Sequence, residues 1–168
     1  VIERLLAAVS KINYPQAKLE VQILDDSNDE TSEKIQAFIS KLDNTSFNFI
    51  HLQRPDRIGF KAGALGYGMK FCKGEFIAIF DADFVPDSNF LKDTISHFKN
   101  AEIGLVQTRW THINEDDSIL TKAQSVMLNT HFGIEQLGRN NAKGFINFNG
   151  TAGIWRKTCI EEAGGWQA

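Results

Sequence analysis

The 168-residue sequence has only two cysteines, Cys72 and Cys159, which lie far apart and form no Cys-x-x-Cys motif. This pattern argues against a zinc site or a disulfide framework, and it predicts two free thiols in a reducing compartment. Excess positive charge is also lacking, because the formal net charge is −3. We therefore expect no nucleic-acid or anionic-lipid partner. No apolar run is long enough to span a bilayer, and no signal peptide is recognisable.

Two common phosphate-binding motifs are absent as well. The chain has neither a Gly-x-x-x-x-Gly-Lys-Ser/Thr loop nor a Gly-x-Gly-x-x-Gly turn. A basic, glycine-containing segment, residues 54–64, leads instead into a predicted helix, and a helix N-terminus favours an anion. Arg54, Arg57 or Lys61 could neutralise a phosphate there. A solvated basic loop is an equally good interpretation of this segment alone.

What is present has the composition of one soluble globular domain. Hydrophobic residues make up 42% of the chain and charged residues 23%, and no repeat or linker divides it. Short apolar runs alternate with helical periodicity throughout, which predicts an α/β architecture. The expected strands are 21–24, 47–52, 76–80 and 103–108, with two short strands flanking 149–151. The expected helices lie around 2–12, 35–42 (after a capping box at 27–30), 61–71, 90–98 and 119–137.

Two of the apolar runs end in pairs of carboxylates. Residues 21–24 run into Asp25-Asp26, and residues 76–80 run into Asp81-Ala82-Asp83. Both runs are typical of buried parallel strands, whose carboxyl ends collect ligands in α/β sheets. Four carboxylates gathered there would repel one another unless a cation lay among them. The pattern therefore suggests a divalent metal carrying a diphosphate.

Each carboxylate pair also has a simpler interpretation. Asp25 and Asp26 could accept hydrogen bonds from a base or ribose, or one of them could cap the following helix. Asp81 and Asp83 could face one hard cation, or lie on a solvated turn; we favour the metal because the turn directly follows a buried strand. Trp110 follows another predicted strand, where its ring could stack on a sugar.

Five motifs occur in the order seen in family 2 glycosyltransferases, and the sequence resembles that family over essentially its whole length. The motifs are Asp25-Asp26-Ser27, Lys61-Ala62-Gly63-Ala64, Asp81-Ala82-Asp83, Gln107-Thr108-Arg109-Trp110 and Phe148-Asn149-Gly150-Thr151-Ala152-Gly153. Within the family the chain is similar to the processive, membrane-bound branch of cellulose synthase-like and mannan synthase-like proteins. The resemblance implies a GT-A domain, a mostly parallel sheet flanked by helices.

The resemblance also implies a reaction and a donor site. The reaction is inverting transfer of a hexose from a UDP- or GDP-sugar to a growing glycan acceptor. Asp26 contacts the base, Asp81 lies near the ribose and diphosphate, and Lys61 lies beside the nucleotide. Asp83 binds Mg²⁺ or Mn²⁺. The donor and acceptor meet at Asn149, Gly150 and Thr151.

Some family features are missing, so we expect residues 1–168 to be one GT-A domain fragment, incomplete at both ends. Gly164-Gly165-Trp166 is followed by Gln167-Ala168, without the Thr-Glu-Asp motif that carries the family's catalytic base. We therefore expect the base to lie beyond Ala168. The family's first strand, which normally sits between the two Asp-bearing strands, should precede Val1, so a gap is expected there. The resemblance implies a full-length integral membrane protein with this domain on the cytoplasmic face.

Two other functions compete with this interpretation. A haloacid dehalogenase-like phosphatase would use Asp81 as nucleophile and Asp83 as general acid. Such an enzyme needs a later acidic pair, and Asp116-Asp117 follows no apolar strand. The third hypothesis is a non-catalytic nucleotide-sugar-binding domain.

Overall fold

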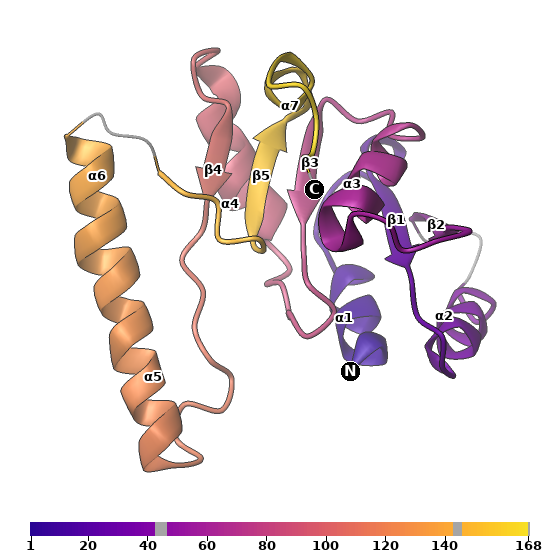
Figure 1. Ribbon diagram of the computed structural model, residues 1–168, viewed down its shortest axis with the longest axis horizontal. Coiled ribbons are helices and arrows are strands. Elements are labelled where there is room, and N and C mark those ends of the chain that lie inside the picture. The colour runs from indigo at the N-terminus through magenta and orange to yellow at the C-terminus, as the bar shows by residue number, and fades with distance from the viewer. Residues whose placement is uncertain (43–46, 143–145, 168) are drawn as a thin grey trace.

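The computed structural model describes residues 1–42, 47–142 and 146–167 (Figure 1). Helices and strands alternate along the chain, as the sequence predicts. The strands are β1 (Glu20–Asp25), β2 (Asn48–Gln53), β3 (Phe76–Ile79), β4 (Leu105–Gln107) and β5 (Gly153–Arg156). The helices are α1 (Ile2–Val9), α2 (Thr31–Ile39), α3 (Phe60–Met69), α4 (Phe90–Ile95), α5 (Ile119–Thr130), α6 (Leu137–Asn141) and α7 (Lys157–Glu162). Short 3₁₀ segments occupy Gln16–Lys18 and Ser96–Lys99, and a π-helical turn, His131–Gln136, joins α5 to α6.

The strands form two separate hydrogen-bonded groups. β1 pairs with β2 in parallel, so that Asp25 lies opposite Gln53 at the carboxyl end of the pair. β5 lies between β3 and β4 and runs antiparallel to both, which makes β3 and β4 parallel to each other. β1 and β3, the two strands that end in carboxylates, therefore belong to different groups.

One hydrophobic core nevertheless joins the two groups of strands. The helical spacing of apolar residues in α1 buries Leu5, Leu6 and Val9 on one face. Leu5 and Val9 pack in the same cluster as Ile154 of β5, which is fully buried, and Phe90 of α4. Partly buried residues of β1, β2, β3 and β4 pack against this cluster. Packing by α1 and α4 therefore holds together strands that share no backbone hydrogen bonds.

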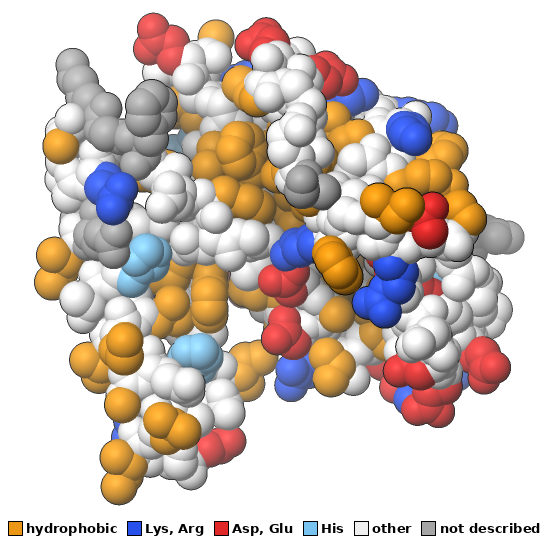
Figure 2. Space-filling view, viewed as in Figure 1, with side chains coloured by type: hydrophobic (Ala, Val, Ile, Leu, Met, Phe, Trp, Pro, Cys, Tyr) orange, Lys and Arg blue, Asp and Glu red, His pale blue; other side chains and the backbone are white. Residues whose placement is uncertain are grey.

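The rod formed by α5, the π turn and α6 stands at one side of the molecule (Figure 1). Ser118 opens α5 with a capping box, in which its hydroxyl accepts from the Thr121 N–H. Apolar side chains remain exposed along this rod, at the left of Figure 2; they are Ile119, Leu120, Val126, Met127 and Ile134. No helix in the described part of the chain is both long and apolar enough to cross a membrane.

Two local predictions are wrong. The capping box expected at 27–30 does not form, because Ser27 donates its hydroxyl to Asp25, and Asp29 accepts the Thr31 N–H in a local turn. Strands were expected on both sides of 149–151, but only β5 forms, and residues 146–149 are irregular. In the first case, hydrogen bonds between residues two positions apart replace the expected box. In the second, the backbone of Asn149 donates to the distant Gln107 side chain and not to a strand partner.

Candidate functional site

Three of the predicted motifs meet beyond the end of β3. Lys61, in the first turn of α3, forms an ion pair with Asp81 and donates a hydrogen bond to the Gly150 carbonyl at 2.8 Å. The backbone N–H of Asp81 donates to the Thr151 hydroxyl at 2.9 Å. Lys61 and Asp81 are each about half exposed (48% and 42% of the side chain), so a ligand can reach both. The fold thus brings together a cation, a carboxylate and a turn from segments far apart in sequence.

Asp83 lies on the exposed turn that follows Asp81. The Phe84 N–H donates to the Asp81 carbonyl at 3.0 Å, which closes this turn. The Asp83 carboxylate is exposed and makes no hydrogen bond or ion pair with the described residues. Within the same residues, no three His, Cys, Asp or Glu side chains form a ready-made metal cluster. One or two carboxylates on an open turn fit Mg²⁺ or Mn²⁺ that takes its remaining oxygen ligands from water and phosphate.

The turn Asn149–Thr151 is held by two glutamines. The Gln107 amide donates to the Thr151 carbonyl at 3.1 Å and accepts the Asn149 N–H at 3.0 Å. Gln136, in the π-helical turn, donates to the Asn149 side chain at 3.1 Å. Gly150 has φ of 84°, a conformation that favours glycine. The turn is therefore fixed from β4, from the helical rod and, through Lys61, from α3.

Sequence reasoning assigned no role to either glutamine. The sequence offered a signal for Gln107, a polar residue that closes an apolar strand, and none for Gln136, whose burial only the structure shows. Trp110 also belongs to this side of the molecule. Its ring contacts His112 and Phe132, with centroids 5.7 and 5.9 Å away. Its buried indole N–H has no hydrogen-bond partner among the described residues.

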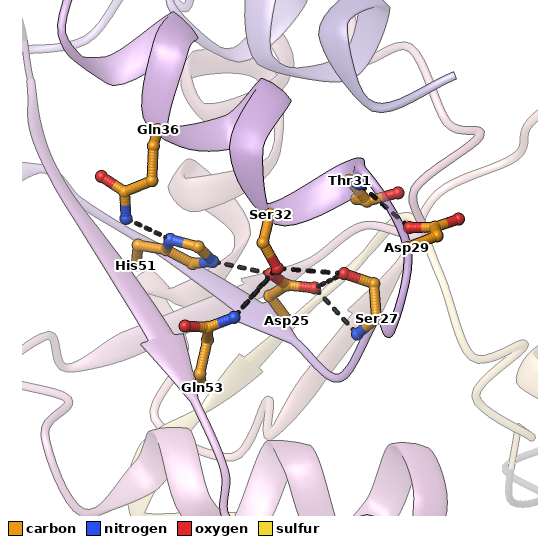
Figure 3. Close-up of polar contacts among 8 residues, drawn as sticks. All are labelled: Asp25, Ser27, Asp29, Thr31, Ser32, Gln36, His51 and Gln53. Carbon is orange, nitrogen blue, oxygen red and sulfur yellow. Dashed lines mark hydrogen bonds and ion pairs between the residues drawn. The ribbon is translucent and has the colours of Figure 1, made fainter.

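Asp25 lies in a closed network and not in the open site (Figure 3). Its carboxylate accepts hydrogen bonds from the Ser27 N–H at 2.9 Å and from the Ser27 and Ser32 hydroxyls at 2.5 Å each. His51 Nε2 lies 2.8 Å from the second oxygen, and the His51 ring in turn contacts Gln36. With both oxygens occupied and only 7% of the residue exposed, Asp25 can support the β1 end without contacting a ligand.

This network makes the stability of the fold depend on pH. Burial acts to raise the pKa of Asp25, but the hydrogen bonds from Ser27, Ser32 and His51 outweigh it and lower the pKa from 3.8 to about 2. Because the pKa of Asp25 is lower in the folded state, the charged carboxylate stabilises the fold at pH values above its ordinary pKa of 3.8. This stabilisation is lost as the pH falls from about 4 to about 2. We expect a loss of about 2 kcal/mol from this group, measured as urea-unfolding free energy across that range. In Asp25→Asn, this part of the pH dependence should be absent.

Asp26, the second residue of the pair, faces a different partner. Arg54 Nε donates to one Asp26 oxygen at 2.9 Å, and Arg54 Nη2 pairs with the other. This two-point contact lowers the pKa of Asp26, chiefly through the hydrogen bonds and then through the charge of Arg54. Asp26 retains 17% exposure of its side chain, while Arg54 retains 7%. The suggestion that Arg54 neutralises a phosphate is therefore wrong, because its guanidinium is buried against Asp26.

Comparison with known proteins identifies the family. The model of the glycosyl transferase family 2 matches residues 1–161. A probable glucomannan 4-beta-mannosyltransferase 3 of Arabidopsis thaliana is 43% identical over 169 residues, covering 96% of this chain. The chain belongs to glycosyltransferase family 2. It spans 30% of the length of the Arabidopsis relative.

Solved structures show that this family 2 member has the expected α/β fold. The mannosyltransferase PcManGT from Pyrobaculum calidifontis, in complex with GDP-Man and Mn²⁺, matches 98% of this chain and 43% of its own, with a TM-score of 0.78 and 22% identity. The S. aureus TarS 1-349 structure in complex with UDP-GlcNAc matches 98% of this chain and 44% of its own, with a TM-score of 0.66 and 16% identity. At these identities the likeness concerns the fold alone.

Proposed function

We propose that this chain is the donor-binding part of an inverting, metal-dependent hexosyltransferase that uses a nucleotide-diphospho-sugar. The observation that carries the proposal is the meeting of Lys61, Asp81 and the Asn149–Thr151 turn beside the exposed Asp83. This arrangement offers a cation and oxygen ligands for a diphosphate, next to a turn that can contact a sugar. Family membership supports the same reading of these residues.

The charges suit a reaction in which a nucleoside diphosphate leaves. Lys61 can donate to a phosphate oxygen, and its ion pair with Asp81 holds its ammonium group beside the Asp81–Asp83 turn. Asp83, with Asp81 beside it, would hold Mg²⁺ or Mn²⁺. Such a metal, when bound, would stabilise negative charge that develops on the diphosphate. Charge stabilisation of this kind lowers the barrier to attack by an acceptor hydroxyl on the anomeric carbon.

We propose guanine as the preferred base and mannose as the preferred sugar. The donors of the buried Arg54 are taken up by the Asp26 carboxylate and by two loop carbonyls. At this position Asp26 therefore offers a base only hydrogen-bond acceptors. Guanine presents adjacent N1–H and N2–H donors to such a group, whereas uracil flanks its single N–H with two carbonyl acceptors. The named activity of the Arabidopsis relative and the GDP-Man bound to PcManGT support this choice.

Three further properties of the whole protein are proposals from the family resemblance. They are transfer to a glycan acceptor, membrane association of the full-length protein, and a general base that removes the acceptor's proton. The phosphatase alternative has less support, because the later acidic pair it needs, Asp116-Asp117, lies in a turn, and because the matching family model is that of a glycosyl transferase family. A generic phosphatase assay with p-nitrophenyl phosphate should therefore give no turnover above background.

Asp26→Ala should weaken GDP binding by about 1–3 kcal/mol, because base donors that lose a buried acceptor stay unsatisfied. Titration calorimetry of the parent and variant with GDP in the presence of Mn²⁺ measures the change. Glu30→Ala is the matched control, since it removes an exposed carboxylate whose ion-pair partner among the described residues is Lys34. Equal affinity of parent and Asp26→Ala would show that Asp26 does not contact the base.

A further inference from the structure

Arg54 follows β2 directly, and its guanidinium bonds to three places at once. Besides holding Asp26, Nη1 donates to the Ile58 carbonyl at 2.8 Å and Nη2 donates to the Phe60 carbonyl at 3.1 Å. Asp26 is 28 residues away in the sequence, at the end of β1. The two carbonyls belong to the loop that leads into α3. One side chain therefore ties the end of β1 to the entrance of the helix that carries Lys61.

The backbone that Arg54 holds has an unusual conformation. Gly59 has φ of 72° and is followed by Phe60 with φ of 44°. Positive φ is unfavourable for a bulky side chain and persists only where surrounding contacts enforce it. The Phe60 side chain does not supply them, because this residue is 77% exposed. The hydrogen bond from Arg54 to the Phe60 carbonyl, immediately before Lys61, can hold the backbone in this conformation.

Gly63 shows how closely this arrangement is packed. A Cβ placed on Gly63 would lie 2.1 Å from the Ile58 carbonyl oxygen and 2.6 Å from Arg54 Nη1. Even an alanine would therefore displace the loop, the arginine or both. Gly66, one turn further along α3, has no atom within 4 Å of the same added Cβ. α3 thus contains one glycine, Gly63, where a side chain would collide with the loop and Arg54, and another, Gly66, where a side chain has room.

We propose that Arg54 is a positioning residue that fixes the base-contacting carboxylate of Asp26 relative to the phosphate-contacting Lys61. The inference rests on the proposed function, because it assumes that Asp26 and Lys61 contact the two ends of one nucleotide. Arg54 itself has its donors turned to Asp26 and to the loop, so it acts through these residues. A ligand that spans two sites gains affinity when their separation is set before binding.

The Gly63→Ala and Gly66→Ala variants form a matched test. Both replace a helical glycine by the best helix former, so both should fold at least as readily on propensity alone. We expect Gly63→Ala to weaken GDP binding about tenfold or more, since small misplacements of binding groups are costly, while Gly66→Ala binds as the parent does. Calorimetric titration with GDP and Mn²⁺ measures both, with circular dichroism as a check on folding.

Substitution of Arg54 adds a readout that a purely structural role would not change. In Arg54→Gln the pKa of Asp26 should return towards its ordinary value of 3.8, because the guanidinium that lowers it is gone. GDP affinity of the variant should then fall relative to the parent as the pH drops below about 5 towards 3.8, because Asp26 becomes protonated in that range. Arg54→Lys retains a cation and should restore much of the parent's pH profile without its full affinity, since Lys lacks the bidentate geometry.

The outcomes separate this inference from the proposed function. If folded Gly63→Ala binds GDP as tightly as Gly66→Ala, the positioning role is wrong, although GDP binding by the parent still supports the donor site. If Arg54→Gln folds and keeps the parent's pH profile, Arg54 does not hold Asp26 for binding. Should Arg54→Gln fail to fold, the glycine pair decides. Failure of the folded parent to bind GDP contradicts the proposed function and this inference with it.

Discussion

Asp83→Asn should abolish the Mn²⁺-dependent part of GDP binding while leaving the fold unchanged. Asp83 is exposed and lies on the turn closed by the Phe84 N–H, so its carboxylate contributes nothing to the core. An amide has no charge and is a poorer ligand for Mg²⁺ or Mn²⁺. Paired titrations with Mn²⁺ and with EDTA give the metal-dependent part as a ratio of dissociation constants. For the parent we expect a ratio of about ten or more, and for the variant a ratio near one.

Asp87→Asn is the control for this experiment. It makes the same chemical change four residues further along the loop, where the oxygen that accepts the Asn89 N–H is retained. This control should keep the parent's metal dependence. Undiminished metal dependence in Asp83→Asn would remove Asp83 from the metal site and leave Asp81 as its remaining carboxylate candidate.

Asp25→Ala should give the largest loss of stability, about 3–5 kcal/mol, which is the usual cost of removing one member of a buried, hydrogen-bonded pair. The change leaves Ser27, Ser32 and His51 without their shared acceptor. Because the side chains of Asp25 and His51 are only 3% and 6% exposed, water cannot readily take the place of the lost carboxylate as acceptor. Urea unfolding followed by circular dichroism measures the free energy, provided the dependence on urea concentration stays unchanged.

Asp29→Ala serves as the comparison, since Asp29 accepts the Thr31 N–H in a fully exposed turn. It should change stability far less than Asp25→Ala. Equal stabilities for the two variants would show that the Asp25 network contributes little to the fold. A loss of GDP affinity in folded Asp25→Asn, without loss of stability, would instead return Asp25 to the donor site that the sequence predicted.

The sequence predicted where the acidic residues lie relative to the strands, because this depends on one short segment at a time. An apolar run followed by Asp81-Ala82-Asp83 located the end of β3, and the run before Asp25 located the end of β1. The different roles of Asp25 and Asp26 were beyond local reasoning. Ser32, His51 and Gln53, which surround Asp25, come from α2 and β2, and only the parallel register of β1 and β2 brings them together.

The parts that sequence reasoning missed depend on long-range contacts. The basic loop offered Arg54 as one of three residues that could neutralise a phosphate, yet its partner is the Asp26 carboxylate at the end of the neighbouring strand. Gln107 and Gln136 take their roles from a turn that lies more than ten residues from either of them. The antiparallel direction of β5 likewise depends on how it enters between β3 and β4, which its own four residues do not specify.

Titration of the parent chain with GDP-mannose in the presence of Mn²⁺ tests the central claim most directly. We expect saturable binding at one site, weakened when EDTA replaces Mn²⁺, and weaker binding of UDP-glucose under the same conditions. Heats no larger than those of dilution, for a folded chain titrated to millimolar GDP-mannose with Mn²⁺ present, would contradict it.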